Sequence, residues 1–149
     1  MAGRILLLSS LLFATLFFVH PVQAQKVIGI PFTEKDGLVY IHVKVNGVLA
    51  TALVDSGASV TNIDASLVES KGCAYRNVFT ASGDKVVGCE RKVDIQAGGL
   101  LVASRVTAYH FPASFGGLKV ILALRDLACG GRVTFDYENQ VLILSPPKK

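Results

Sequence analysis

A carboxylate, a hydroxyl and a glycine follow one another where an apolar stretch of this sequence ends. Residues 52–54 are Ala-Leu-Val, and Asp55, Ser56 and Gly57 come directly after them. A carboxylate at the end of an apolar strand is costly to bury alone, so a chain that places one there usually uses it. Asp-Ser-Gly is also an ordinary turn composition, because Asp and Ser bond their own backbone and Gly accepts positive φ. The tripeptide is therefore either a strand-ending turn or a site for acid–base chemistry.

The segment before Asp55 predicts a hairpin that fixes where the carboxylate emerges. Residues 38–45 and 48–54 alternate in hydropathy, and the Asn46-Gly47 pair between them is the strongest short-range signal for a type I′ turn. Such a turn places Val45 opposite Val48, Val43 opposite Ala50, Ile41 opposite Ala52 and Val39 opposite Val54. That apolar face should meet the core, and Asp55 then ends the opposite face, paired with Leu38.

The remaining sequence predicts a mainly β domain, a small closed barrel or sandwich of seven to nine strands with one or two short helices. An edge strand is expected at 27–32, because Pro31 is tolerated there. Asp64 can cap a short helix over 65–70, and a second helical turn is expected at 125–128. Further strand-like stretches are 58–63, 75–79, 86–88, 89–96, 100–111, 119–124, 132–137 and 140–144.

A polar hairpin tip at 80–85 is a second functional candidate. Ser82, Gly83 and Asp84 form the turn between two extended stretches, and Gly88 lies at the base of the hairpin. Such a segment is either a plain surface hairpin or a mobile lid, for which a small polar tip is suitable.

The first 24 residues have the order of a secretory signal peptide. Arg4 precedes an apolar run from Ile5 to Val19, and the segment ends Val22-Gln23-Ala24. The run of about 15 residues is short of the roughly 20 that a membrane-spanning helix needs, which favours cleavage and export to the periplasm or the medium over a retained anchor. We expect 25–36 to be an N-terminal segment, 37–145 the domain and 146–149 a tail, with no membrane association after cleavage.

Composition argues against several other classes of function. The formal net charge of +4 is modest, and the basic residues do not gather into a stripe interleaved with aromatics, so no nucleic-acid partner is expected. Cys73, Cys89 and Cys129 match no usual metal-ligand spacing, and no metal is expected. In an exported protein one pair of the three can bridge, Cys73 with Cys89 closing the shortest loop, which leaves one thiol over.

Several motifs together resemble the retropepsin-like aspartic proteases, in particular the single-domain bacterial members. They are Leu-Val-Asp-Ser-Gly-Ala-Ser at 53–59, Thr-Ala-Ser-Gly-Asp-Lys-Val-Val-Gly at 80–88, Val-Ile-Leu-Ala-Leu-Arg-Asp-Leu at 120–127 and Val-Thr-Phe-Asp-Tyr-Glu-Asn-Gln-Val-Leu-Ile-Leu at 133–144. The third motif departs from the family pattern. Ala123 stands where the family has Gly, and Asp126 falls one place late. One added methyl is tolerable unless the position needs positive φ or packs against another backbone.

The resemblance implies an aspartic endopeptidase without a cofactor. Asp55 would be the catalytic carboxylate, supported by Ser56, Gly57 and Ala58, and the turn at Ser82, Gly83 and Asp84 would be a flap over a peptide or protein substrate. Because the chemistry needs two carboxylates and the chain has one Asp-Ser-Gly, the resemblance also implies a symmetric homodimer.

Three alternatives remain beside that reading. The weakest is a purely structural exported β domain, which leaves the placement of Asp-Ser-Gly unexplained. A second aspartate of the same chain could complete the pair, although Asp64, Asp94, Asp126 and Asp136 are better explained as cap, strand-face or turn residues. His42 is not expected to act as a catalytic base. It should be a solvated strand residue, about 13 Å along the strand from Asp55. The same fold could also be a catalytically inactive exported module that binds an extended peptide without cutting it.

Overall fold

The computed structural model describes residues 27–69, 72–80, 83–129 and 131–145. The expected signal peptide, the tail and Ser82 lie outside the described residues. Ten strands, two 3₁₀ turns and one short α-helix follow one another in this part of the chain. They are β1 (Ile28–Lys35), β2 (Leu38–Val45), β3 (Val48–Asp55), β4 (Asn62–Asp64), η1 (Ala65–Leu67), β5 (Ala74–Phe79), β6 (Lys85–Ala97), β7 (Leu100–Tyr109), η2 (Ala113–Phe115), β8 (Val120–Ala123), α1 (Leu124–Ala128), β9 (Arg132–Asp136) and β10 (Val141–Ser145).

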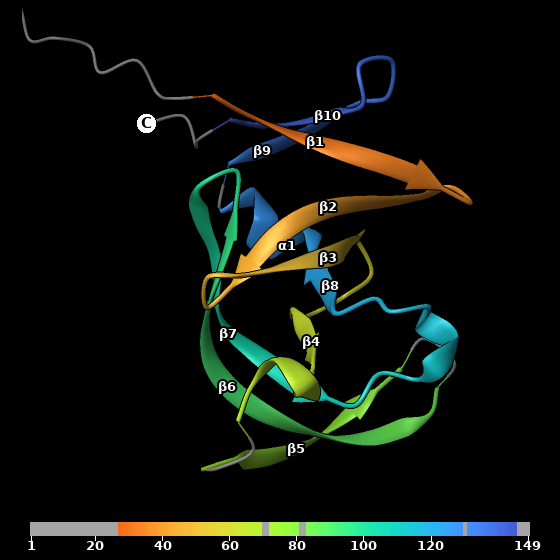
Figure 1. Ribbon diagram of the computed structural model, residues 1–149, viewed down its shortest axis with the longest axis vertical. Coiled ribbons are helices and arrows are strands. Elements are labelled where there is room, and N and C mark those ends of the chain that lie inside the picture. Colours follow the sequence, from red (N-terminus) through yellow and green to blue (C-terminus); the bar gives the residue numbers. More distant parts are fainter. Residues whose placement is uncertain (1–26, 70–71, 81–82, 130, 146–149) are drawn as a thin grey trace, which may run out of the picture.

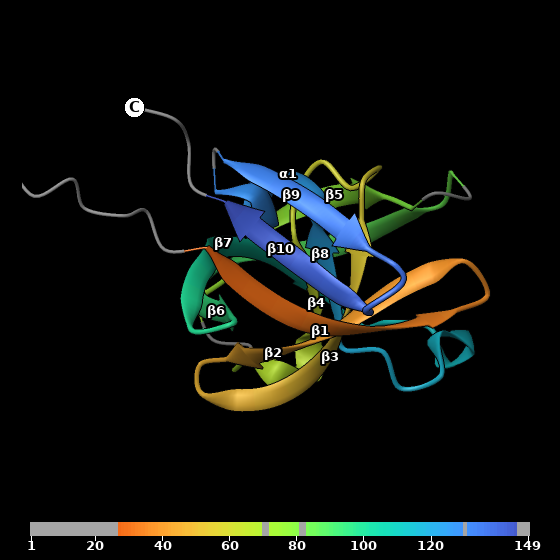
Figure 2. The same ribbon diagram turned by 90° about the horizontal axis from the view of Figure 1, so that it is seen from above.

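The strands hydrogen-bond in the order β5-β6-β7-β4-β8-β3-β2-β1-β10-β9. Strands β2 and β6, which are far apart in this order, also pair with each other, at Lys44 with Gln96 and at Val45 with Ile95. The six strands from β6 to β2 therefore form a ring, around which β6 and β7 curve in Figure 1. Strands β1, β10 and β9 lie side by side outside that ring, as the view from above shows (Figure 2).

The β2–β3 hairpin has the predicted register. Val45 pairs with Val48, Val43 with Ala50 and Ile41 with Ala52. Asn46 and Gly47 both have positive φ, 48° and 86°, as a type I′ turn requires. The turn chemistry and the hydrophobic alternation agree, so one register is strongly preferred.

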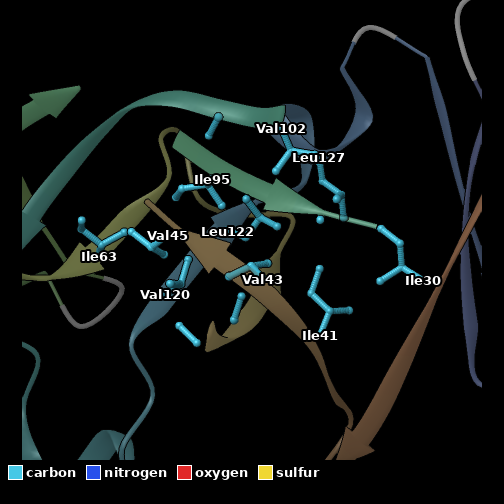
Figure 3. Close-up of a cluster of buried hydrophobic side chains, with 14 of the residues drawn as sticks. Ile30, Ile41, Val43, Val45, Ile63, Ile95, Val102, Val120, Leu122 and Leu127 are labelled. Carbon is cyan, nitrogen blue, oxygen red and sulfur yellow. The ribbon is translucent and has the colours of Figure 1, made fainter. Parts of the chain in front are cut away.

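Aliphatic side chains from all parts of the ring fill its interior (Figure 3). The face of β2 that was expected to meet the core does so. Its four members, Val39, Ile41, Val43 and Val45, are buried. They share one cluster with large buried aliphatic residues from other elements: Ile63, Ile95, Val120, Leu122, Leu127 and Leu142. The polar face of β2 stays exposed at His42 and Lys44.

Strand β1 is not an edge strand, which corrects the expectation from Pro31. Its first half, up to Pro31 opposite Val141, pairs with β10, and its second half, from Phe32 opposite Ile41, pairs with β2. Proline lacks a backbone N–H, so it fits where the strand changes from one partner to the other.

Three other parts of the chain differ from the sequence prediction. The stretches expected as separate strands at 86–88 and 89–96 form the single strand β6, and the described residues form ten strands where seven to nine were expected. The stretch expected as a strand at 58–63 is a strand only over Asn62–Asp64, since residues 56–61 form the turn after Asp55. The helix expected over 65–70 is a single 3₁₀ turn at Ala65–Leu67, although Asp64 does cap it. No helix in the described ranges is long and apolar enough to cross a bilayer.

Candidate active site

Asp55 is the last residue of β3 and lies beside the last residue of β8. The two strands run parallel, and Asp55 pairs with Ala123. The backbone N–H of Gly57 donates to Asp55 Oδ1 at 2.7 Å. Asp55 is half-buried, Ser56 and Gly57 are exposed, and Ala58 is half-buried. One carboxylate oxygen is thus held by its own turn, while the turn itself is open to a substrate or a second chain.

Thr61 fixes the far end of this turn, and the sequence motifs did not single it out. Its side chain is fully buried. The hydroxyl donates to Asp126 Oδ2 at 2.7 Å and accepts from the Ala123 backbone N–H at 3.1 Å. One hydroxyl therefore links the Asp55 turn to both β8 and α1. The only sequence signal was the polar pair Thr61-Asn62 between the apolar residues Val60 and Ile63, just after the turn.

Ala123 does not need to be a glycine for its conformation. Its φ is −61° and its ψ is 126°, an extended geometry that any residue adopts. The residue is completely buried, so its methyl group is accommodated within the packing beside Asp55. Position 123 therefore does not need positive φ, which was the first condition under which an alanine would be intolerable here.

Asp126 has a structural partner despite lying one place later than the family pattern. It lies in α1, with one oxygen on Thr61 and the other 3.8 Å from Arg125 Nε. The remaining aspartates are elsewhere. Asp94 is exposed on β6, and Asp136 accepts hydrogen bonds from Asn139 in the β9–β10 turn. They occupy the strand-face and turn positions expected of them.

Asp64 forms a buried polar cluster after β4. Its carboxylate accepts hydrogen bonds from the Ser66 N–H and hydroxyl, the Phe111 N–H and Lys119 Nζ. Burial by itself raises the pKa of a carboxyl group, but these donors outweigh it and hold the pKa of Asp64 well below its usual range. Asp64 thus joins the chain after β4 to the loop before β8.

The β5–β6 hairpin carries the turn expected to act as a flap. Gly83 has φ 86°, and a side chain there would meet no atom within 4 Å, so the space beside Gly83 is open. The Gly83 N–H donates to the Thr80 carbonyl at 2.9 Å, and the Asp84 N–H donates to Thr80 Oγ1 at 3.1 Å. Gly83 and Asp84 are both exposed.

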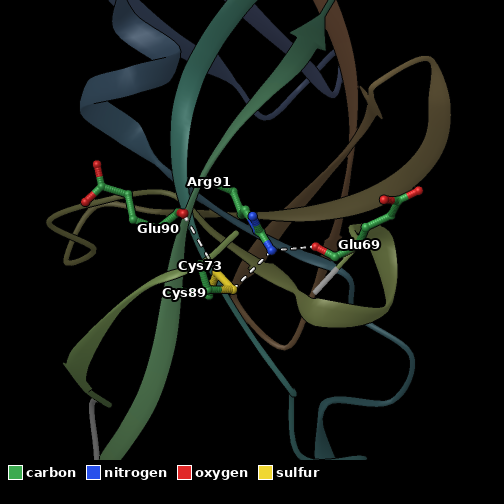
Figure 4. Close-up of a disulfide and its surroundings, with 5 residues drawn as sticks. All are labelled: Glu69, Cys73, Cys89, Glu90 and Arg91. Carbon is green, nitrogen blue, oxygen red and sulfur yellow. Dashed lines mark hydrogen bonds between the residues drawn. A yellow bond between two sulfur atoms is a disulfide. The ribbon is translucent and has the colours of Figure 1, made fainter. Parts of the chain in front are cut away.

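A disulfide joins Cys73 to Cys89 at the base of this hairpin (Figure 4). Their Cα atoms are 5.3 Å apart, and the bridge closes the shortest of the possible loops. Arg91 lies against it, with Nη2 donating to the Glu69 carbonyl at 2.6 Å and lying 3.1 Å from Cys73 Sγ. Cys129 is a free cysteine on the surface, and partial desolvation of its thiol together with the charge of Asp126 raises its pKa. Its raised pKa disfavours the reactive thiolate.

Within the part of the chain that the structure describes, no group of three or more His, Cys, Asp or Glu side chains is arranged to hold a metal ion. The candidate site consists of the Asp55 carboxylate at the end of β3, which accepts a hydrogen bond from the Gly57 amide, and of the buried Thr61 hydroxyl, which supports the turn after Asp55.

A scan against protein-family models found no match, and none of the curated proteins matched the chain. Among solved structures, the fold is similar to the crystal structure of a retropepsin-like aspartic protease from Rickettsia conorii, with a TM-score of 0.57 and 20% sequence identity. The match covers 83% of this chain and 94% of that chain. At this identity the likeness bears on the fold alone. The chain thus has a mainly β, ring-like architecture consistent with the retropepsin-like fold.

Proposed function

We propose that the chain is an aspartic endopeptidase in which Asp55 and its copy in a second subunit form the catalytic pair. The observation that carries the proposal is the position of Asp55: it ends β3 beside Ala123 of β8, with the Gly57 amide on Oδ1, in a retropepsin-like fold. The exposed residues Ser56 and Gly57 leave room for a second chain to approach.

The proposed chemistry follows from two carboxylates held close together. They cannot both ionise easily, so they share one proton. The ionised member takes a proton from the attacking water while the protonated member hydrogen-bonds to the scissile carbonyl oxygen. The Gly57 amide orients one oxygen of Asp55 and leaves the other for the partner carboxylate and the water. The hairpin tip at Gly83 and Asp84 would close over the peptide.

The homodimer is required by this chemistry, because the chain has one Asp-Ser-Gly motif. The described aspartates Asp64, Asp126 and Asp136 have their own structural partners, which supports pairing between chains over pairing within one. Sedimentation of the chain from residue 25 should show a dimer at micromolar concentration, at least when a peptide substrate is present. A strict monomer under both conditions would contradict the proposal.

The decisive experiment compares the native protein with Asp55→Asn on a degenerate peptide pool between about pH 3 and pH 7. We expect cleavage by the native protein and none by the variant, with the same urea unfolding midpoint for both. Asp94→Asn, on an exposed face of β6, is the matched control and should cleave normally. Peptide binding that survives Asp55→Asn, together with no cleavage by the native protein at any pH, would instead identify a non-catalytic peptide-binding module.

We also propose that the protein is exported to the periplasm or the medium. The Cys73–Cys89 disulfide supports this, because such bonds persist in oxidising compartments. N-terminal sequencing of the protein from fractionated cells should give Gln25 as the first residue. A cytoplasmic protein that retains Met1 or Ala2 would contradict export.

A further inference from the structure

A cavity of about 420 Å³ lies next to the turn that carries Asp55, and arginines dominate its charged lining. Val60 and Asp126 form the wall nearest the turn. Arg76 of β5, Arg105 of β7 and Arg125 of α1 come from three separate elements to the same cavity. The volume falls within the range of pockets that hold small ligands or single side chains of a bound chain.

The positive charge of this cavity is only partly neutralised. Its two acids are Glu90 and Asp126, against three arginines. Glu90 is shared between Arg76 and Arg105, the latter at 3.4 Å. Asp126 already accepts from Thr61, and its nearest contact to Arg125 is 3.8 Å, longer than a hydrogen bond.

The arginine side chains also remain accessible to a ligand. Those of Arg105 and Arg125 are 70% and 66% exposed. A guanidinium group presents several N–H donors in a planar fork that matches a carboxylate in two parallel hydrogen bonds. The cavity therefore has spare donors and one uncompensated positive charge, a combination that selects a carboxylate.

The position of the cavity connects it to the proposed active site. Val60 follows Asp55 by five residues, and Asp126 is bonded to Thr61, which in turn holds the Ala123 amide beside Asp55. Arg76 and Glu90 belong to the hairpin that carries the proposed flap. The wall of the cavity thus combines the Asp55 turn with the flap strands, the two elements between which an extended peptide would pass.

We propose that this cavity is a specificity subsite that binds a carboxylate of the peptide substrate, an Asp or Glu side chain a few residues from the scissile bond. The inference rests on the proposed function, since it assigns a substrate preference to the same site. The protein would then favour acidic peptides.

The test uses blocked peptides, acetylated and amidated, built on a sequence that the native protein cleaves in the degenerate pool. Each position in turn carries Glu, Gln or Lys. We expect one position at which kcat/KM is about fivefold to tenfold higher for Glu than for Gln, a preference that weakens at ~0.5 M salt. A version with a free C-terminal carboxylate separates recognition of a side chain from recognition of a chain end.

Three variants assign the preference to the cavity. The double variant Arg105→Gln/Arg125→Gln should bring the Glu-to-Gln ratio of kcat/KM close to one. Arg105→Glu should shift the preference toward Lys. Arg132→Gln removes the same charge from an exposed position on β9 and should keep the preference. A Glu-to-Gln ratio that the double variant does not alter would overturn the proposal.

Binding of the same labelled peptides to Asp55→Asn separates this proposal from the proteolytic one. If the native protein cleaves nothing, the peptides are built instead on a sequence from the pool that Asp55→Asn binds. In either case, tighter binding of the Glu peptide, lost on adding the two arginine substitutions, supports the subsite. Cleavage of many peptides with equal binding and equal rates for Glu and Gln at every position would overturn the subsite and leave the protease proposal standing.

Discussion

Replacing Thr61 by valine should disturb the candidate site while leaving Asp55 in place. The buried hydroxyl makes two hydrogen bonds, one to the Asp126 carboxylate and one from the Ala123 amide. Valine has nearly the same shape, so the core volume is kept and the hydroxyl alone is lost. The effect therefore measures the hydrogen bonds and not a cavity.

The size of the effect follows from the two groups that lose a partner. A hydrogen bond to a charged acceptor contributes about 1.5–3 kcal/mol, and a buried amide left without an acceptor costs about 1–3 kcal/mol. The side chain of Asp126 is 26% exposed, so water replaces part of its loss. We expect Thr61→Val to lower the free energy of unfolding by about 2–4 kcal/mol.

The matched control is Thr61→Ser, which keeps the hydroxyl and removes one methyl group, at a loss of about 1 kcal/mol. Urea unfolding of the three proteins at pH 7 measures both changes. If the protein is a protease, Thr61→Val should also cleave more slowly at temperatures where it is still folded, because the Ala123 amide beside Asp55 is no longer held. Equal destabilisation by valine and serine would refute the role assigned to the hydroxyl.

Two further predictions concern pH and the disulfide. The folded-state pKa of Asp64 lies below its unfolded value, so the contribution of Asp64 to stability is present above about pH 4 and is lost as the pH falls. The difference in the free energy of unfolding between the native protein and Asp64→Asn should therefore shrink from pH 7 to pH 3. A difference that stays constant over this range would contradict the lowered pKa. Cys73 and Cys89 are 16 residues apart, so reduction of their disulfide should lower the free energy of unfolding by about 3 kcal/mol in the chain-entropy model. The measurement uses the Cys129→Ser variant as its control. An unchanged unfolding midpoint would show that the bridge does not restrain the unfolded chain.

The local parts of the fold could be predicted from the sequence because each has a local cause. The Asn46-Gly47 turn set the β2–β3 register, and that register placed Asp55 at the end of β3. Asp64 was recognised as a cap for the same reason, because an N-cap acts on the residues directly after it. Helix length after Asp64 was overestimated, since a 3₁₀ turn and a short helix have the same capping signal.

The contacts that complete the candidate site could not be predicted, because they join distant parts of the chain. Thr61 and Asp126 are 65 residues apart, and no local pattern marks one as the partner of the other. The arginines of the cavity come from β5, β7 and α1, and along the sequence they look like scattered surface charges. Pro31 misled the prediction in a different way, because a strand that changes partners resembles an edge strand at the one residue without an N–H.

The sequence separation between these contacting residues also determines when the candidate site can form during folding. Asp55 and Ala123 are 68 positions apart in the sequence and pair in a parallel ladder that no hairpin can nucleate. The β2–β3 hairpin can form early from local contacts, but the turn after Asp55 lacks its supports until β8 and α1 have packed against Thr61. The turn that holds the carboxylate is therefore supported only in a chain that has folded through α1, and a fragment that ends before β8 should keep the hairpin without the complete site.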